Sequence, residues 1–568
     1  MAGFYTDNKE FFLKQLKFDE IINDLENNFT EISDNTPANL DEAHQWYKMV
    51  LDNAGKICEE FIAPRAEDVD AEGPCHHNSS TVTWAPGTQE NMNVLARAGY
   101  MGGTLPRKYG GLNMPITINN IIVEMVSQAD ASLMNLVGLQ DIAVTLFKFG
   151  NEEQKNRVLP KFCSGEVSGS MALTEPDAGS DLQAVMLKAF EEDGKWYLDG
   201  VKRFITNGCG EVSLVLARSE AGTKDGRGLS MFLYERDRDD NMIIRRIEDK
   251  HGIHGSPTCE LQFNKAECEL VGKRRFGLIK YVMSLMNGAR LAVSAQALGI
   301  AQAAYEEAVK YANEREQFGK AIVHFPAVYQ MLADMRAEIE TSRLLFYHTS
   351  LTVDYMDMYE RKAEKGEKVR AEMKKWTAKA DFLTPLIKFT STEMANKATY
   401  DAVQIHGGCG FMKDFPVERL SRDARITNIY EGTTQLQIIA ALPRISSGLF
   451  KDMVHELLEE EKEHSPEISE KIFDEIDKIM TAIEIVKKAE NKELIDYCGN
   501  YFVEAASILY RMALFVPVAR NNEEKKDLFD FYASKSLART SYLLSMIETF
   551  NKNYSDSPDS LKNPFVKK

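Results

Sequence analysis

A single carboxylate beside a glycine is the feature of this sequence that best suggests chemistry. Glu431 follows an apolar strip that contains Ile426 and Ile429, and Gly432 stands directly behind it. A general base needs this placement, because a turn can aim the carboxylate into an apolar pocket, where desolvation raises its pKa toward working pH. A glutamate before a glycine is more often a solvated turn residue, so the argument depends on motifs further upstream.

Two upstream motifs offer groups that suit a flat ligand. In the segment 171–181, small residues let the backbone approach a ring, and Thr174 and Ser180 offer hydroxyl groups. Further along, Phe204 and Thr206 place an aromatic ring and a hydroxyl at the end of a predicted strand, where they could pack on a ring system and bond its edge. The alternative readings are a surface turn for the first motif and a core aromatic residue for the second.

A third motif offers a cation for a phosphate group. The segment 287–290 reads Asn-Gly-Ala-Arg, and Arg315 follows near the end of the same predicted helix. The planar fork of an arginine can hold a diphosphate through two parallel hydrogen bonds. The alternative is a cation that the dipole at a helix C-terminus favours.

Composition narrows the class of protein. The chain has 568 residues, enough for several packed domains, and a formal net charge of -18, which disfavours a nucleic-acid partner. Its 8 cysteines include no Cys-x-x-Cys pair, so we expect no metal site and a reducing, cytoplasmic location. We see no signal peptide, and we expect no membrane span because no apolar stretch reaches the ~18 residues that a span needs.

The elements that must position these residues fall into three kinds. Up to residue 165 the apolar spacing predicts helices, with 116–149 a long run broken at Gly138. Short runs rich in β-branched and aromatic residues then predict a β-domain. Its expected strands are 196–201, 203–208, 212–218, 229–234, 242–247 and 259–263.

Helical periodicity returns after the β-domain. The runs 278–315, 325–359, 376–404 and 436–442 predict the antiparallel helices of a bundle, and the Lys/Glu-rich insert 361–375 reads as a solvated helix extension or a loop. Three more amphipathic runs, 472–489, 501–518 and 528–550, follow the bundle. A membrane-surface role for the apolar face in 501–520 is possible, but burial against the bundle explains it more simply.

In their order and spacing, these motifs resemble the acyl-CoA dehydrogenase family over residues 40–445. The resemblance implies an α+β, mainly α fold with a helical N-terminal domain, a middle β-domain, a C-terminal four-helix bundle and an extra C-terminal helical segment. The expected divisions are 1–40 for an N-terminal helical extension, 41–165, 166–275, 276–447 and 448–568. The resemblance also implies FAD as cofactor, oxidation of an acyl-CoA to its trans-2-enoyl-CoA, and electron transfer to an electron-transfer flavoprotein.

The resemblance assigns roles position by position. Glu431 corresponds to the base that removes the α-proton; a minority of the family carry that base just before Arg290, where this chain has Ala289. Phe204 stands where many members carry tryptophan. The implied FAD contacts are Met171, Leu173, Thr174, Phe204, Thr206, Arg315, Phe318, Gln404, Gly407, Gly408, Thr433 and Gln435. Among them, the contacts that the resemblance implies across a subunit interface are Arg315, Phe318, Gln404, Gly407 and Gly408. The implied substrate contacts are Ser180, Asn287, Arg290, Tyr430 and Gly432.

The length of the chain separates it from typical members, which end soon after the bundle. In its added helices it resembles the very-long-chain acyl-CoA dehydrogenases and, through the segments 252–259 and 286–291, the 3-methylmercaptopropionyl-CoA dehydrogenases. In long members the added helices cover the surface that pairs dimers into tetramers, so we expect a homodimer, with a tetramer as the alternative. Two other functions stay open: an acyl-CoA oxidase, and a non-catalytic assembly protein that kept the fold.

Overall fold

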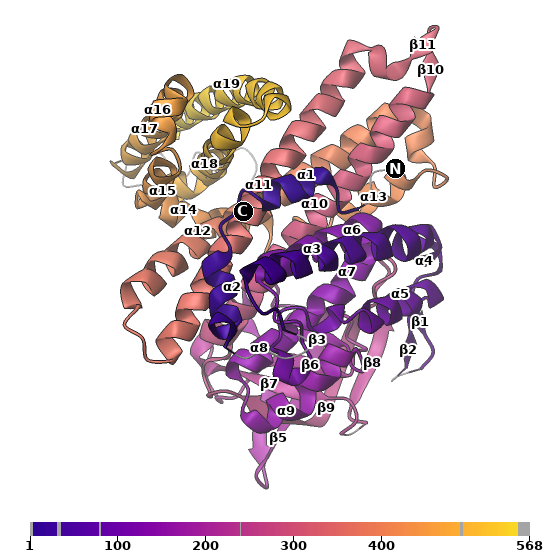
Figure 1. The fold of residues 1–568 in the computed structure, drawn as a ribbon. Helices are drawn as coiled ribbons and strands as arrows, with labels where there is room; N and C mark the ends of the chain where they lie inside the picture. The colour runs from indigo at the N-terminus through magenta and orange to yellow at the C-terminus, as the bar shows by residue number, and fades with distance from the viewer. Residues whose placement is uncertain (1–3, 31–35, 79–80, 239, 489–491, 555–568) are drawn as a thin grey trace. The chain divides into compact units, whose positions relative to one another are not determined.

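The computed structural model describes residues 4–30, 36–78, 81–238, 240–488 and 492–554. It contains two compact units. Figure 1 labels helices and strands of both units. The first unit consists of Met1–Glu10, Phe18–Glu307 and His406–Thr427, and the second of Phe11–Lys17, Ala308–Ile405 and Asn428–Lys568.

A helical layer opens the first unit. Its helices are α2 (Asp19–Leu25), α3 (Leu40–Ile57), α4 (Ala66–Glu72), α5 (Pro86–Arg97), α6 (Ile116–Ala129), α7 (Ala131–Gly138), α8 (Ile142–Phe149) and α9 (Glu152–Ser164). The predicted run 116–149 breaks at Gly138, as expected, and also at Asp130. There the Asp130 carboxylate accepts hydrogen bonds from the backbone N–H groups of Ser132 and Leu133, which caps a new helix.

The β-structure of the first unit closes on itself. Its strands are β3 (Gly169–Ala172), β4 (Lys188–Glu192), β5 (Lys195–Thr206), β6 (Val212–Arg218), β7 (Leu229–Glu235), β8 (Met242–Ile247) and β9 (Thr258–Val271). The pairings β4–β5, β5–β9, β9–β7, β7–β6 and β6–β4 form a ring, with β3 added beside β6 and β8 beside β9. A separate two-stranded ribbon joins β1 (Cys75–His76) to β2 (Val82–Thr83).

Burial explains why β6 and β7 are apolar at nearly every position. Alternate residues of β6, such as Leu214 and Leu216, belong to a core shared with α8 and α9, whereas Val215 and Ala217 belong to a second core shared with β5 and β9. Both faces are therefore covered, and all seven residues of each strand are buried.

The predicted strands need three corrections. The runs 196–201 and 203–208 are one strand, β5, which stays paired with β9 across two register shifts. Strands β3 and β4 were not predicted, and β9 extends well beyond 259–263.

Long helices make up the second unit. They are α11 (Pro326–Glu364), α12 (Arg370–His406, whose last residue lies in the first unit), α14 (Thr434–Ser446), α15 (Leu449–Leu457), α16 (Glu461–His464), α17 (Pro466–Lys488), α18 (Lys492–Arg520) and α19 (Glu523–Tyr554). Helices α1 (Asp7–Leu13) and α10 (Met283–Glu314) begin in the first unit and end in the second, and α13 (Pro416–Ala424) belongs to the first. A small hairpin pairs β10 (Glu316–Gln317) with β11 (Lys320–Ala321).

The predicted fold class, mainly helical with a β-domain and added C-terminal helices, is confirmed. The charged insert 361–375 is divided between the end of α11, a turn and the start of α12, so both of its predicted readings hold in part.

The added helices pack closely within the second unit. Tyr510 of α18 meets Phe382 of α12 edge-on, and Phe515 of α18 contacts Phe12 at a ring distance of 6.2 Å. An 18-residue window in α18 is apolar enough to cross a membrane, with mean hydropathy 1.5, although we expected no such stretch. In the structure 89% of that window is buried, as expected for a core helix.

Candidate active site

The loop that carries Glu431 is a strained turn in the second unit. Glu431 has φ +54° and the following Gly432 has φ +88°, so two successive residues occupy the left-handed region. That region is costly for a residue with a side chain and persists only where neighbouring groups hold it. Both residues are half-buried.

Two buried side chains hold this turn by one backbone oxygen. The carbonyl of Gly432 accepts hydrogen bonds from Lys388 Nζ at 2.6 Å and from Gln437 Nε2 at 2.8 Å. Both side chains belong to residues with no exposed surface, Lys388 on α12 and Gln437 on α14. A buried ammonium needs hydrogen-bond acceptors, so the lysine and the strained turn stabilise each other.

A carboxylate on α12 holds the two ends of the same loop. Glu393 accepts hydrogen bonds from Asn428 Nδ2 and from Thr434 Oγ1, and Thr434 N donates to Asn428 O at 3.1 Å. The loop 428–434 is therefore closed at its base by Glu393 and fixed near its tip by Lys388. These hydrogen bonds hold the backbone of the loop that carries Glu431.

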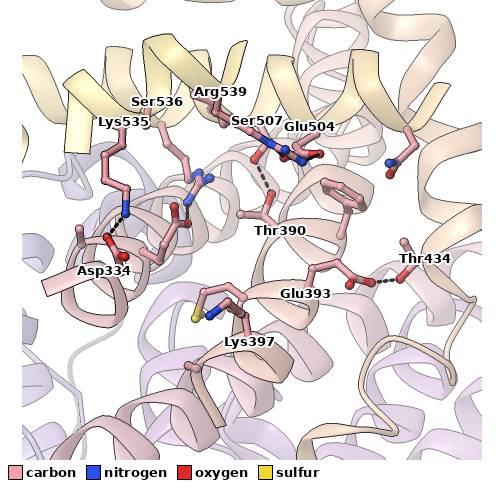
Figure 2. A pocket seen from close by; sticks show the side chains of 18 of the residues that line it. Asp334, Thr390, Glu393, Lys397, Thr434, Glu504, Ser507, Lys535, Ser536 and Arg539 are labelled. Carbon is pink, nitrogen blue, oxygen red and sulfur yellow. Dashed lines mark hydrogen bonds and ion pairs between the residues drawn. The ribbon is translucent and has the colours of Figure 1, made fainter. Parts of the chain in front are cut away.

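Glu393 and Thr434 also line a cavity of about 900 Å³, whose other lining residues come from α11, α12, α14, α18 and α19 (Figure 2). Each of its four cations pairs with a carboxylate. The pairs are Lys535–Asp334, Arg539–Glu504, Lys397–Asp401 and Arg511–Glu338. Among the described lining residues, the positive charge of the cavity is therefore fully neutralised.

In the first unit, β5 and the segment after β3 share an edge. Arg203 N donates to Thr174 O at 2.9 Å, and the buried Lys202 Nζ donates to Leu173 O at 2.7 Å and to the Glu175 carboxylate. Burial lowers the pKa of Lys202 to about 8, against the opposing charge of Glu175. This cross-link fixes the spacing between two of the predicted FAD-contact segments.

The exposed groups at that edge suit a flat ring. Phe204 has φ +61° and leaves 53% of its surface exposed, and the Arg203 guanidinium lies 4.7 Å from its ring centre. Thr174 and Thr206, on the two segments joined at this edge, are half-buried. An aromatic residue held open in a left-handed conformation is the type of strain that marks a binding edge.

The start of α10 carries two of the predicted substrate contacts, Asn287 and Arg290. Arg290 Nη1 donates to Asn287 Oδ1 at 3.2 Å, one helical turn away. Ser180 is exposed in the turn after β3. Gly407 and Gly408 are exposed, and a Cβ added at either would meet nothing within 4 Å, so the backbone there is open to a close ligand.

The hairpin after α10 exposes the predicted cross-subunit contacts. Phe318 is 94% exposed at φ +54°, and the edge of its ring contacts Phe325. Arg315 is exposed beside it. Exposure to water does not stabilise an aromatic side chain, so this exposed ring is typical of a surface that contacts another protein chain.

The predicted site residues divide between the two units. The first unit holds Met171, Leu173, Thr174, Ser180, Phe204, Thr206, Asn287, Arg290, Gly407 and Gly408. The second holds Arg315, Phe318, Gln404, Tyr430, Glu431, Gly432, Thr433 and Gln435. Within the second unit, the geometry gathers residues 430–433 in one loop, and Gln404 and Gln435 are exposed on their helices.

Sequence reasoning missed Lys388, Glu393 and Gln437. The available signal was Lys388, a lysine between Ile387 and Phe389 inside an apolar stretch of a predicted helix. Such a lysine is buried only when acceptors surround it. Among the described residues, no group of three or more His, Cys, Asp or Glu side chains is arranged to hold a metal ion.

Three family models match consecutive parts of the chain. The acyl-CoA dehydrogenase N-terminal domain matches residues 45–166, the middle domain 170–266 and the C-terminal domain 279–445.

Two curated relatives extend this match. An acyl-CoA dehydrogenase of Bacillus subtilis is 37% identical over 349 residues, which cover 60% of this chain and 86% of that protein. The 3-methylmercaptopropionyl-CoA dehydrogenase of Ruegeria pomeroyi is 35% identical over 428 residues, which cover 70% of this chain and 69% of that protein.

Solved structures show the same fold. A chain from a structure titled for the electron transferring flavoprotein of Acidaminococcus fermentans and flavin-based electron bifurcation is 33% identical, with TM-score 0.61, and covers 73% of this chain and 98% of that chain. An acyl-CoA dehydrogenase of Bacillus anthracis complexed with FAD has TM-score 0.75 at 22% identity. It covers 95% of this chain and 94% of that one, so the likeness in fold includes the added C-terminal helices.

Proposed function

This chain belongs to the acyl-CoA dehydrogenase family, and we propose that it oxidises an acyl-CoA thioester to the trans-2-enoyl-CoA with Glu431 as the base. The observation that carries the proposal is the left-handed turn of Glu431 and Gly432, clamped through one carbonyl by Lys388 and Gln437. A base must stay within hydrogen-bond reach of the proton it removes, and a clamped turn provides that reach.

Removal of the α-proton needs help, because a carbon acid beside a thioester is far too weak for a carboxylate alone. We assign the backbone N–H of Glu431 to the thioester carbonyl oxygen, where it would stabilise the negative charge of the enolate. Donors fixed before the reaction cost no reorganisation when the charge develops. The clamped loop holds this N–H and the carboxylate in one rigid segment, so both groups keep their relative position.

The residues present fit FAD, the cofactor of this family. At the β5 edge, Thr174 and Thr206 offer hydroxyl groups for the edge of a ring, and the exposed Phe204 offers an aromatic face. The open backbone at Gly407 and Gly408 suits a close approach by the nucleotide part. When bound, FAD supplies the hydride-accepting ring that the side chains of the protein lack.

The remaining contacts and partners are assigned on the same basis. We assign the exposed Arg315 and Phe318 to the FAD of a second copy of the chain, which makes the active form a homodimer; a tetramer measured by light scattering would contradict this. We assign electron-transfer flavoprotein as the acceptor, supported by the likeness to the Acidaminococcus chain. A cytoplasmic location stays a prediction that cell fractionation can test.

The experiment is an anaerobic titration of the purified, FAD-loaded protein with a panel of acyl-CoA thioesters. We expect one class of thioester to bleach the visible flavin absorbance, and the Glu431→Gln variant to bind FAD equally well and remain unbleached. The panel includes straight, branched, aromatic and sulfur-containing acyl groups, because a single methylene changes discrimination by only about 1–3 kcal/mol.

Two other results would redirect the proposal. Stoichiometric release of peroxide in air, with no preference for electron-transfer flavoprotein, would indicate an oxidase. Full FAD occupancy without bleaching by any thioester would indicate a protein that kept the fold for assembly.

A further inference from the structure

Two cysteines separated by fifty positions meet at the end of β5 in the first unit. In the β5–β9 pairing, Ile205 lies opposite Cys259, and the chain then turns back toward β9 at Gly208 and Cys209. A Cβ built on Gly208 would stand 2.8 Å from the Cβ of Cys259. Cys209, the next residue, packs against the core that contains Cys259.

The two thiols differ in exposure. Cys259 is fully buried, whereas Cys209 keeps part of its surface exposed. Cys209 Sγ lies 3.4 Å from Asn207 Oδ1, to which it donates in its thiol form. A small solute therefore approaches the pair from the side of Cys209.

The two thiols also differ in charge preference. The hydrogen bond from Cys259 lowers the pKa of Cys209, and the charge of Arg236 and the indole of Trp84 lower it further. Burial and the charge of Glu211 raise this pKa but do not cancel the decrease. The same pairing with Cys209, together with burial, raises the pKa of Cys259. Arg236 is held in place by its own hydrogen bond to Gly208 O at 3.1 Å. Cys209 is thus the better thiolate and the better nucleophile of the two.

We propose that Cys209 and Cys259 form a reversible disulfide when the protein meets hydrogen peroxide. The arrangement combines a partly exposed first cysteine near Arg236 with a fully buried second cysteine in the core against which the first one packs. This is the pairing that converts a transient oxidation into a stable bond.

The chemistry balances in two steps. The Cys209 thiolate attacks one peroxide oxygen, so an S–O bond forms, the O–O bond breaks, and the departing hydroxide becomes water with the proton that Cys209 released. The Cys259 sulfur then attacks the Cys209 sulfur, so the S–S bond forms and the S–O bond breaks. The second hydroxide takes the Cys259 proton and leaves as water. The thiols lose two electrons and two protons, and the peroxide is reduced to two waters.

The bond would act on the β5 edge. Forming it breaks the Cys209–Asn207 hydrogen bond and ties the turn after β5 to β9. Asn207, at φ +49°, anchors that turn through hydrogen bonds from its Nδ2 to Ser168 and Gly169. Since Phe204 and Thr206 lie directly before it, oxidation should weaken FAD binding severalfold; this second part rests on the proposed function.

The test treats the full-length protein with hydrogen peroxide, alkylates the remaining thiols, and measures intact mass and the digested peptides. We expect two thiols to disappear together, with the loss of two hydrogen atoms and a peptide linked between Cys209 and Cys259 that dithiothreitol separates. In Cys259→Ala, Cys209 should stop at the sulfenic acid, which dimedone traps. Cys209→Ser should show neither product, and Cys75→Ser, which removes an exposed cysteine elsewhere in the unit, should still form the bond.

The outcomes separate the two claims. Oxidation at Cys75 or Cys409 while Cys209 and Cys259 stay reduced would overturn the disulfide, whatever the protein does with acyl-CoA. A linked peptide with unchanged FAD affinity, measured by the fluorescence of released flavin, would overturn the effect on the edge alone. Failure of the thioester titration would leave the mass measurement fully informative, so this inference and the proposed function cannot fail for the same reason.

Discussion

The ammonium group of Lys388 lies 2.6 Å from the carbonyl oxygen of Gly432, although the lysine has no exposed surface. The contact joins α12 to the turn that carries Glu431, and it places a buried charge where the chain adopts two consecutive left-handed conformations. The lysine is therefore a positioning residue for the loop.

Replacing Lys388 with methionine keeps most of the side-chain volume but removes the donor. We expect kcat to fall by about ten- to a hundredfold with little change in KM, because a misplaced base weakens the reaction more than it weakens binding. Steady-state kinetics would measure kcat and KM separately and so distinguish a misplaced base from weaker binding. Lys397→Met is the matched control, since Lys397 lies on the same helix, is exposed and pairs with Asp401; it should behave as the parent.

Phe204→Ala tests the exposed aromatic ring at the β5 edge. Loss of one ring contact is worth about 0.5–1.5 kcal/mol, so the Kd for FAD should rise by roughly two- to tenfold. Titration of the apoprotein with FAD, followed by flavin fluorescence, gives the value. Phe190→Ala removes an aromatic from the neighbouring strand, where it packs on Tyr197; equal losses in both variants would mean that Phe204 only supports the fold.

His348 predicts how the second unit responds to acid. Burial, with the nearby Lys379, lowers the pKa of His348 to about 4 from an ordinary 6.5, and its Nε2 lies 3.1 Å from Tyr510 Oη. The folded state therefore favours the neutral ring. Its contribution to stability is complete above pH 6.5 and is lost as the pH falls toward 4.

Denaturant unfolding at pH 7.5 and pH 5 can check this contribution. At pH 5 the unfolded histidine is protonated and the folded one is neutral, so the histidine should account for about 2 kcal/mol of the loss in stability. In His348→Gln that share of the loss should disappear. A variant with the same pH dependence as the parent would show that other groups set the acid response.

Arg511→Met tests the ion pair between α18 and α11. Arg511 is almost fully buried and donates to Glu338, Thr341 and Ser342, so its loss leaves three acceptors without their donor. We expect the thermal midpoint to fall by several degrees, as a loss of about 1–3 kcal/mol predicts. Arg539→Met removes an exposed pair with Glu504 on the same face and should change the midpoint by less than about one degree.

The local sequence pattern was enough to place several strands and the long helices. Strands β6 and β8 begin and end at the bounds of the predicted runs 212–218 and 242–247, and α10 begins five residues inside the predicted run 278–315. The division of β5 into two strands was wrong because the pairing with β9 continues across its irregularities. Strand β3, only four residues long, exists because β6 pairs beside it, which no local window reports.

The sequence predicted the candidate base, Glu431, but not the side chains that hold its turn. Glu431 stands out by its glycine and by the apolar residues before it, but the lysine that holds the turn, Lys388, lies 44 positions before Gly432. Likewise, the meeting of Cys209 and Cys259 depends on a strand register and leaves no trace in their spacing. Packing of the folded chain brings such residues together, and a single sequence does not show which distant residues become neighbours.

The ring contact between Phe12 and Phe515 has a consequence for how the protein is made. A ribosome adds residues at about 5–20 per second, so the phenylalanine near the start of the chain emerges roughly half a minute to two minutes before its partner exists. During that interval Phe12 lacks the aromatic ring that it contacts in the folded protein. Synthesis of the last helices, rather than the first, therefore completes the N-terminal end, and a nascent chain stalled before α18 would offer Phe12 to chaperones.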